Sequence, residues 1–325
     1  MGVATTVRRM EAATRAVGQL DESSRVVVTG GDGFLGRHLV RALSERGARV
    51  LVVDDGRLGR DPGVAPDGCS RVWRDFQDPE TLEAVRDFAP TVVFHLAAMH
   101  FVPDCDRDPT ACLALNVLGT ERLLAALRAT TVEAVVFCSS AVVYGFDDRP
   151  RRESDPLSPR HVYAQSKWLG EGLLRHFHLD RPDVRSVAAR LFNLVGPGDT
   201  ARHVVPEIVD AVAAGRRLRL GNVWPRRDYV HVADVTSALT TLATGPAEYT
   251  AVNVGSGVGR SVADVLETLS EIMGRAPLVD RDPGRERATD GHLVADIATI
   301  TSSTSWRPRW TFEATLRQLL DQAGS

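Results

Sequence analysis

The residues best suited to chemistry are Tyr163 and Lys167, four positions apart in the run Tyr163-Ala164-Gln165-Ser166-Lys167. On a helix this spacing places both side chains on one face. A tyrosine hydroxyl has an ordinary pKa near 10, and this pKa must fall by about 3, worth roughly 4 kcal/mol, for the group to act as a base near neutrality. A neighbouring ammonium lowers it. The pair therefore predicts a proton-transfer site.

A third candidate is Ser140, in the run Cys138-Ser139-Ser140-Ala141-Val142-Val143-Tyr144-Gly145. Its hydroxyl can hydrogen-bond the reacting oxygen and orient or pass a proton. A tyrosine and a lysine four residues apart are common on helices, so the pair alone says little. The serine before it and a glycine-rich turn earlier in the chain make the set specific. Ser140, Tyr163 and Lys167 are the predicted catalytic residues.

The glycine-rich turn is Gly30-Gly31-Asp32-Gly33-Phe34-Leu35-Gly36, between a short β-branched run and a helical pattern. Glycines allow positive φ and close approach of the backbone to a pyrophosphate. The helix N-terminus adds unpaired N–H groups and a partial positive charge. The spacing is GxxGxxG, and it predicts a dinucleotide site. Its predicted cofactor-binding residues are Gly30, Gly33, Phe34, Leu35 and Gly36.

An acidic residue, Asp54, ends the next strand, 21 residues after the middle glycine. A carboxylate there accepts hydrogen bonds from the adenosine ribose and repels a 2′-phosphate, so NAD is favoured over NADP. Arg57 and Arg60 lie close by and weaken that preference. The cationic nicotinamide of NAD would further lower the pKa of the tyrosine. Asp75 and Phe76 follow the third strand-like segment and are expected near the adenine, although Asp75 is equally well an ordinary loop carboxylate.

Apolar runs of strand length alternate with helical patterns from residue 25 onward, and this alternation predicts an α/β fold with a doubly wound parallel sheet. A helix is expected over 38–46, after the glycine turn. The expected strands cover residues 26–28, 50–53, 91–94, 134–137 and 186–189.

The later part of the chain is less regular and predicts a smaller, interleaved C-terminal lobe. Helical patterns cover 206–214, 262–273 and 312–323. The first 24 residues read as a frayed or weakly helical extension. The predicted organisation is an extension over 1–24, a dinucleotide-binding domain over 25–190 and a substrate lobe over 191–325.

Further motifs follow the catalytic set in the order of a known family. With the glycine turn and the Tyr163 run, they resemble the extended short-chain dehydrogenase/reductase superfamily, in its nucleotide-sugar epimerase/dehydratase branch, from Arg25 to the C-terminus. The segments are His95-Leu96-Ala97-Ala98, Asn116-Val117-Leu118-Gly119-Thr120, Leu191-Phe192-Asn193, Arg227-Asp228-Tyr229-Val230-His231-Val232, Asn253-Val254-Gly255-Ser256-Gly257 and Ala295-Asp296.

The resemblance implies a Rossmann domain that binds NAD and a C-terminal lobe that binds a nucleotide-diphosphate sugar. Arg227 would pair with one phosphate and Arg285 or Arg287 with another, since a guanidinium fork suits a diphosphate. His100 either approaches the sugar or simply packs. The resemblance also implies two sets of contacts. Those with the cofactor are made by Leu96, Ala97, Ala98, Asn116, Tyr163 and Lys167, and those with the substrate by Ser140 and Asn193.

The residue types around Ser140 distinguish between reactions of this branch. Dehydratases and decarboxylases carry an acid where this chain has Val142, preceded by Ala141, and a valine cannot abstract a proton. The run through Gly145 is instead similar to the S-A-T-V-Y-G of 4-epimerases. The implied reaction is epimerisation at C4, through transient oxidation to a 4-keto sugar and hydride return. Leu220-Gly221-Asn222 resembles GDP-mannose dehydratases, so UDP, GDP and TDP stay open as the nucleotide.

Three other functions remain alternatives. A 4-ketoreductase or dehydrogenase would consume or release NAD(P)H stoichiometrically. A 4,6-dehydratase is disfavoured by Val142. A non-catalytic dinucleotide sensor would be expected to lose the tyrosine or the lysine, which this chain keeps.

The composition excludes several classes of function. The net charge of −3 does not indicate the excess of positive charge that nucleic-acid binding needs. The sequence also has no uninterrupted apolar run of about 18 residues, so no membrane span is predicted. The N-terminus lacks the apolar segment of a signal peptide. Four cysteines without CxxC spacing predict cytosolic thiols and no metal site. The expected location is the cytoplasm, and the resemblance implies a homodimer through the helices that carry Asn116 and Tyr163.

Overall fold

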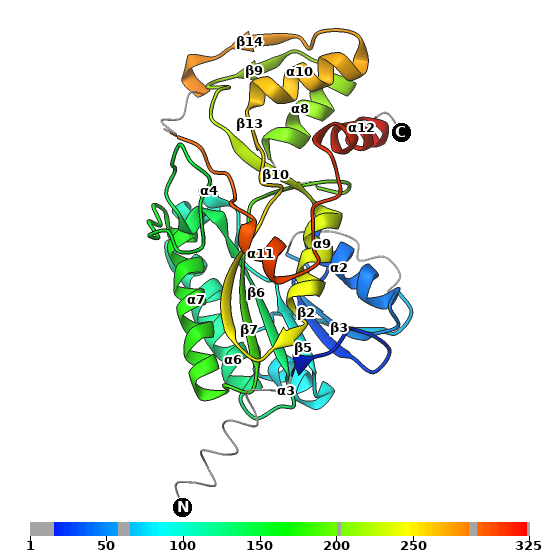
Figure 1. Ribbon diagram of the computed structural model, residues 1–325, viewed down its shortest axis with the longest axis vertical. Helices are drawn as coiled ribbons and strands as arrows, with labels where there is room; N and C mark the ends of the chain where they lie inside the picture. The colour runs from blue at the N-terminus through cyan, green and yellow to red at the C-terminus, as the bar shows by residue number, and fades with distance from the viewer. Residues whose placement is uncertain (1–15, 58–65, 200–202, 286–290, 324–325) are drawn as a thin grey trace, which may run out of the picture. The chain divides into compact units, whose positions relative to one another are not determined.

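The computed structural model describes residues 16–57, 66–199, 203–285 and 291–323 (Figure 1). Its contacts divide the chain into two compact units, and the chain crosses between them several times. Unit 1 comprises Met1–Val143, Leu157–Arg190 and Thr236–Val252, and unit 2 comprises Tyr144–Pro156, Leu191–Val235 and Asn253–Ser325.

Unit 1 is built on a seven-stranded sheet of order β12-β7-β6-β5-β2-β3-β4. The pairings of β2 with β3 and β5, of β3 with β4, and of β5 with β6 are parallel. From β2 the chain builds the sheet first toward β3 and β4, and then on the other side from β5 onward. In such folds ligands bind at the carboxyl ends of the two strands where this direction changes, here β2 and β5. The predicted doubly wound fold is confirmed. The strands are β2 (Arg25–Thr29), β3 (Arg49–Asp54), β4 (Cys69–Trp73), β5 (Val92–His95), β6 (Ala134–Ser140), β7 (Arg185–Leu191) and β12 (Tyr249–Val254).

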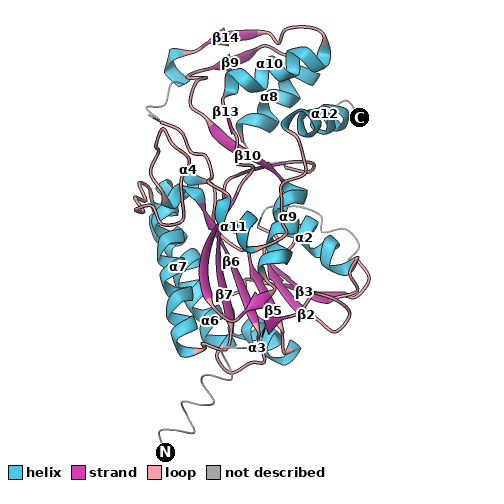
Figure 2. Cartoon of the chain, in the orientation of Figure 1, coloured by secondary structure: helices cyan, strands magenta, loops and turns pink. Residues whose placement is uncertain are grey.

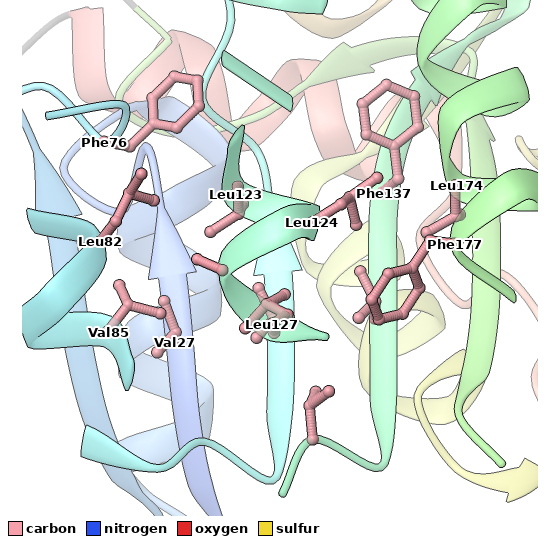
Figure 3. Close-up of a cluster of buried hydrophobic side chains, with 14 of the residues drawn as sticks. Val27, Phe76, Leu82, Val85, Leu123, Leu124, Leu127, Phe137, Leu174 and Phe177 are labelled. Atoms are coloured by element: carbon pink, nitrogen blue, oxygen red, sulfur yellow. The ribbon is translucent and has the colours of Figure 1, made fainter. Parts of the chain in front are cut away.

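Helices cover both faces of this sheet (Figure 1). On one face α6 (Thr120–Leu127) lies between α3 (Pro79–Phe88) and α7 (Val162–Asp180), and α2 (Phe34–Ser44) lies on the other. Alternate strand residues point to opposite faces, so Val27, Val93 and Val135 meet the first group. Figure 3 shows this core. Its labelled residues are Val27, Phe76, Leu82, Val85, Leu123, Leu124, Leu127, Phe137, Leu174 and Phe177.

The first helix begins earlier than the sequence predicts. The expected range was 38–46, whereas α2 begins at Phe34, because Gly33 is extended and serves as its N-cap. The expectation for the N-terminal extension is also wrong where the structure describes it. Ala16–Val17 forms strand β1, antiparallel to β11 (Gly245–Pro246), so backbone pairing replaces the expected frayed helix. Residues 1–15 lie outside the described part of the chain.

A long apolar helical stretch runs over residues 109–127. It comprises α5 (Pro109–Leu113), a π-helical turn η1 (Ala114–Gly119) and α6, and it follows the short helix α4 (Val102–Arg107). By length and composition alone it could cross a membrane, but core helices of globular proteins pass the same test. Leu123 and Leu127 are fully buried in the core of unit 1.

Unit 2 contains small sheets and three amphipathic helices (Figure 2). The three helices predicted from periodicity are confirmed as α8 (Val204–Ala213), α10 (Val262–Met273) and α12 (Phe312–Ala323), and they pack around one core. A capping box of Ser261 and Asp264 begins α10. The other elements that the structure describes are η2 (Ala141–Val143), β8 (Asn193–Val195), β9 (Leu218–Leu220), β10 (Arg227–His231), α9 (Val232–Leu242), β13 (Gly259–Arg260), β14 (Val279–Arg281), η3 (Pro283–Arg285) and α11 (Ala298–Ser303).

Candidate active site

The glycine turn follows β2 and leads directly into α2. Gly30 has φ +70°, and a Cβ there would lie 2.8 Å from the backbone nitrogen of Ala97, in the loop after β5. A Cβ on Gly36 would lie 2.1 Å from the carbonyl oxygen of Gly30. Both positions therefore need glycine. Gly33 is the N-cap of α2 and makes no side-chain hydrogen bond to the helix, which opens with Phe34 and Leu35. The first N–H groups of α2 are therefore suited to a pyrophosphate.

Asp54 lies at the end of β3 and ties two loops together. Its Oδ2 accepts a hydrogen bond from the backbone N–H of Asp32 at 3.0 Å, and its Oδ1 accepts one from Gly56 at 2.9 Å. The carboxylate therefore lies beside the glycine turn, as a group that binds the ribose hydroxyls should. The sequence analysis missed Arg71, on β4, whose Nη2 donates to Asp32 Oδ1 at 3.0 Å.

The other charged groups near Asp54 are paired with each other. Arg57 forms ion pairs with Asp55 at 2.8 Å and with Asp75 at 2.7 Å, and Arg60 lies outside the described residues. The Phe76 ring is buried and packs edge-on against His95, with ring centroids 5.0 Å apart. The structure thus places the Phe76 ring in the core. Adenine contact by Asp75 and Phe76 stays a prediction.

A buried histidine, also missed as a functional candidate, holds the loop that contains Leu96, Ala97 and Ala98. His95 Nδ1 lies 2.7 Å from Thr29 Oγ1, and its Nε2 lies 2.9 Å from Thr120 Oγ1. Thr120 donates its own proton to the carbonyl of Asn116, so it must accept from Nε2–H. Burial, and secondly the charge of Lys167, lower the pKa of His95 to about 3. The imidazole is a neutral bridge between β2, β5 and α6.

His95 is expected to make the protein sensitive to acid. Its native pKa of about 3 lies below the ordinary 6.5. Between these two pH values the histidine is protonated in the unfolded chain and neutral in the native chain. The free energy of unfolding should therefore fall as the pH drops from 6.5 toward 3, and less steeply in a His95→Gln variant. Urea unfolding across this range measures both slopes. His176→Gln, at an exposed histidine, is the control, and equal slopes in all three proteins would disprove the assignment.

Asn116 sits in the π-helical turn and fixes a loop instead of presenting an open amide. Its Oδ1 accepts from the N–H of Met99 at 2.8 Å. Its Nδ2 donates to the carbonyl of Met99 and to Ser166 Oγ, both at 2.9 Å. These bonds join the loop after β5 to α7. Direct cofactor contact by Asn116, inferred from the family resemblance, stays a prediction, and positioning is the role that the contacts support.

The catalytic residues converge at the start of α7 and the end of β6. His161 caps α7 by accepting from the N–H of Ala164 at 3.2 Å, which sets the helix start just before Tyr163. The side chain of Ser140 lies close enough to the hydroxyl of Tyr163 to lower the pKa of that hydroxyl. Lys167 Nζ lies 5.8 Å from the centre of the Tyr163 ring. The structure therefore brings the three predicted catalytic residues together.

Burial controls the protonation of this group of residues. Burial raises the pKa of Tyr163, and the nearby hydroxyl of Ser140 opposes that rise. The predicted lowering of this pKa by Lys167 is thus wrong for the protein groups alone, because the prediction ignored how deeply the hydroxyl is buried. Burial also lowers the pKa of Lys167 to about 8. Its Nζ donates to the carbonyl of Cys138 at 2.9 Å, which fixes its position.

Two predicted substrate residues lie on adjacent strands of unit 2. Asn193 begins β8 and pairs in parallel register with Tyr229 of β10. Arg227 begins β10, and its guanidinium lies 4.6 Å over the ring of Phe146. Its described hydrogen bonds both leave from Nη1, toward the carbonyls of Arg226 and Gly291. Burial lowers the pKa of Arg227, but a guanidinium stays charged, so its other N–H groups suit a phosphate.

The remaining predictions have less structural support. His100 is exposed in the loop after β5. Arg285 ends the short turn η3, but its side chain is outside the description, as is the whole of Arg287. Val142 lies in η2, where the related dehydratases carry an acid. Among the residues described, no cluster of three His, Cys, Asp or Glu side chains could hold a metal ion.

Comparison with known proteins identifies the family of this chain. The model of the NAD dependent epimerase/dehydratase family matches residues 26–255. The UDP-glucose 4-epimerase of Azospirillum brasilense is 30% identical, over 94% of this chain and 97% of that protein. The GDP-6-deoxy-D-mannose reductase of Pseudomonas aeruginosa is also 30% identical, over 92% and 96%. The crystal structure of Thermus thermophilus UDP-glucose 4-epimerase complexed with NAD has a TM-score of 0.81 and 32% identity, over 92% and 98%.

Proposed function

Because this chain belongs to the NAD dependent epimerase/dehydratase family, we propose that it is an NAD-dependent nucleotide-sugar epimerase acting at C4. The observation that carries the proposal is the convergence of Ser140, Tyr163 and Lys167 in unit 1, with Val142 in place of a second acid. This set can move one proton beside a hydride acceptor. It offers no carboxylate for removing a C5 proton, so dehydration is disfavoured.

The glycine turn fits NAD, since it leads directly into the N-terminus of α2, where the N-cap Gly33 offers no side chain to the first N–H groups of the helix. Gly30, Gly33 and the first N–H groups of α2 would hold the pyrophosphate, and Asp54 the adenosine ribose. When bound, NAD supplies a reversible hydride acceptor at the nicotinamide.

Within the protein, Tyr163 takes the proton of the C4 hydroxyl. It returns this proton after the 4-keto sugar has rotated so that the hydride comes back to its other face. Ser140 orients the reacting oxygen, and its nearby hydroxyl favours the ionised form of Tyr163. Lys167, held by the carbonyl of Cys138, supplies a positive charge on the same helix face. These roles need no other acid or base.

Substrate recognition rests on unit 2. Arg227 would pair with the diphosphate, and Asn193 would donate to it from the neighbouring strand. The names of the 4-epimerase relatives favour a UDP-hexose. A GDP-linked sugar is the second candidate, supported by Leu220-Gly221-Asn222 and by the GDP-6-deoxy-D-mannose reductase relative.

The deciding experiment is incubation of the purified protein with UDP-, GDP- and TDP-hexoses without added cofactor. A new product of unchanged mass, separated by chromatography, would establish epimerisation with resident NAD. Loss of one water would instead establish dehydration. No turnover of these hexoses, together with reduction of an added nucleotide 4-keto sugar by NAD(P)H and a gain of two hydrogens, would establish a keto-sugar reductase, the second candidate function.

The enzyme is further proposed to act as a homodimer through the helices that carry Asn116 and Tyr163. Large apolar side chains are exposed on these helices, and such patches mark protein contacts. They are Leu113, Leu118, Trp168 and Leu169.

Replacing Trp168 by arginine is expected to convert the dimer into monomers. Removing a central tryptophan from an interface costs about 2 kcal/mol or more, so the dimer dissociation constant should rise by at least about 30-fold. Light scattering after size exclusion measures the mass. Trp224→Arg, at a tryptophan that is even more exposed, is the matched control. A Trp168→Arg protein that keeps the wild-type mass would contradict this interface.

A cytoplasmic location is proposed as well. The four cysteines, Cys69, Cys105, Cys112 and Cys138, are all free thiols, as expected in a reducing compartment. No association with nucleic acid or membrane is part of the proposal.

A further inference from the structure

A buried ionic network includes Ser139, the residue before Ser140, together with Glu171 and Arg190. Glu171 Oε1 accepts hydrogen bonds from Ser139 Oγ at 2.6 Å and from Arg190 Nε at 2.9 Å, and its Oε2 accepts from Arg190 Nη2 at 2.7 Å. The side chains of Glu171 and Arg190 are each only 5% exposed. Separating the two charges would leave each of them buried without a partner, which is strongly unfavourable, so this network holds its members tightly.

The network belongs to a longer line of contacts between β6 and α7. Tyr163, Lys167 and Glu171 recur every four residues on α7, so they follow one face of the helix. The last four residues of β6 each meet this helix. The contacts are Phe137 with Gly170, where a Cβ would lie 2.4 Å from the ring; the carbonyl of Cys138 with Lys167; Ser139 with Glu171; and Ser140 with Tyr163.

We infer that Glu171 is a positioning residue for catalysis, which clamps β6 against α7 through Ser139 and Arg190. The bond to Ser139 lies between the two β6 contacts on which chemistry depends, at Cys138 and Ser140. A shift of β6 along α7 would loosen both at once. The inference rests on the proposed function, because positioning matters only if Ser140 and Lys167 serve Tyr163.

The effect of Glu171 is geometric and not a direct charge effect. Its carboxylate is neutralised by the guanidinium of Arg190. The pKa of Lys167 is lowered by burial first, and neighbouring thiols oppose that lowering. Arg190 comes from β7, so the clamp also fixes α7 to a second strand of the sheet.

The test compares two variants of the full-length protein with its resident NAD. Ser139→Ala removes one hydrogen bond and leaves the ion pair intact, whereas Glu171→Gln removes the charge. Both should lower kcat by between about tenfold and a hundredfold with little change in KM, because a small misplacement of catalytic groups has that effect. Ser186→Ala is the matched control, since Ser186 is a fully buried serine on β7 that bonds only to the carbonyl of Val184 among the described contacts of its hydroxyl.

A readout that does not need turnover is the ionisation of Tyr163. Its pKa can be followed by tyrosinate absorbance, taken as the difference between each protein and the same protein carrying Tyr163→Phe. A loosened Ser140 lowers the pKa of Tyr163 less, so this pKa and the acidic limb of the kcat profile should both move to higher pH. A structural role alone would lower the melting temperature without moving either.

The outcomes separate the inference from the proposed function. A lower kcat together with the shifted Tyr163 pKa supports the clamp. Wild-type kcat in Ser139→Ala, or a lower kcat with an unshifted pKa, overturns it. If Glu171→Gln does not fold, Ser139→Ala decides the matter. A wild-type protein that epimerises no sugar would count against the proposed function, while the absorbance titration would still test the clamp.

Discussion

Replacing Tyr163 by phenylalanine is expected to lower kcat by about a thousandfold while the purified protein keeps its NAD. The phenyl ring fills the same space, so the helix start and the cofactor site should persist. The variant lacks the hydroxyl that takes the C4 proton, and a positioned acid–base group contributes about 10²–10⁴-fold. Chromatography of the sugar products gives the rate, and the absorbance of released cofactor gives the NAD content.

Tyr249→Phe is the matched control for this experiment. It removes the same hydroxyl from another partly buried tyrosine of unit 1, whose ring lies against the guanidinium of Arg175. Its kcat should stay within a few fold of wild type. A Tyr163→Phe protein that still turns over within tenfold of wild type would require a different base and would remove the central residue of the proposed mechanism.

Replacing Arg227 by alanine is expected to raise KM for the nucleotide sugar by about 10- to 100-fold and to leave NAD binding unchanged. A hydrogen bond to a charged group contributes about 1.5–3 kcal/mol, which corresponds to that range. The guanidinium is held in place by the ring of Phe146 and the carbonyl of Gly291, so it is ordered before a phosphate arrives. Initial rates over a range of substrate concentrations give KM and kcat.

Arg226→Ala serves as the control for Arg227→Ala. Arg226 is the adjacent cation, but its guanidinium is engaged with Asp264 at 3.2 Å and with the carbonyl of Gly259. Its replacement should change KM by less than about fivefold, since a single exposed ion pair contributes only about 0–1 kcal/mol. Equal effects from both variants would mean that overall positive charge, and not Arg227 itself, attracts the diphosphate.

The sheet and the catalytic set could be predicted because both depend on local patterns. Runs such as Val26-Val27-Val28 form buried parallel strands, and the sequence positions all five of these runs correctly. The glycine turn is dictated by close backbone approaches that exclude a side chain. Tyr163 and Lys167 share a helix face by spacing alone. These features need no knowledge of distant contacts.

Most of the features that the sequence did not predict depend on contacts between distant parts of the chain. The ion pair of Asp32 with Arg71 joins the glycine turn to β4, 39 residues later. The raised pKa of Tyr163 follows from burial by neighbouring elements, which no motif reveals. The π-helical turn around Asn116 has no strong local signal, since nothing in its sequence Ala-Leu-Asn-Val-Leu-Gly distinguishes a π-helical turn from an α-helical one. The sequence therefore identifies the residues of the site, whereas burial and long-range ion pairs determine their pKa values.

The position of β12 also affects how the protein is made. This strand pairs beside β7, yet it follows β7 by about 60 residues, most of which belong to unit 2. At roughly 5–20 residues per second, a ribosome needs about 3–12 s to add them. Until then β7 presents an open row of peptide groups, which can pair with other chains. Nascent copies of this enzyme are therefore vulnerable to aggregation during synthesis, and a molecular chaperone that covers that edge should raise the yield of folded protein.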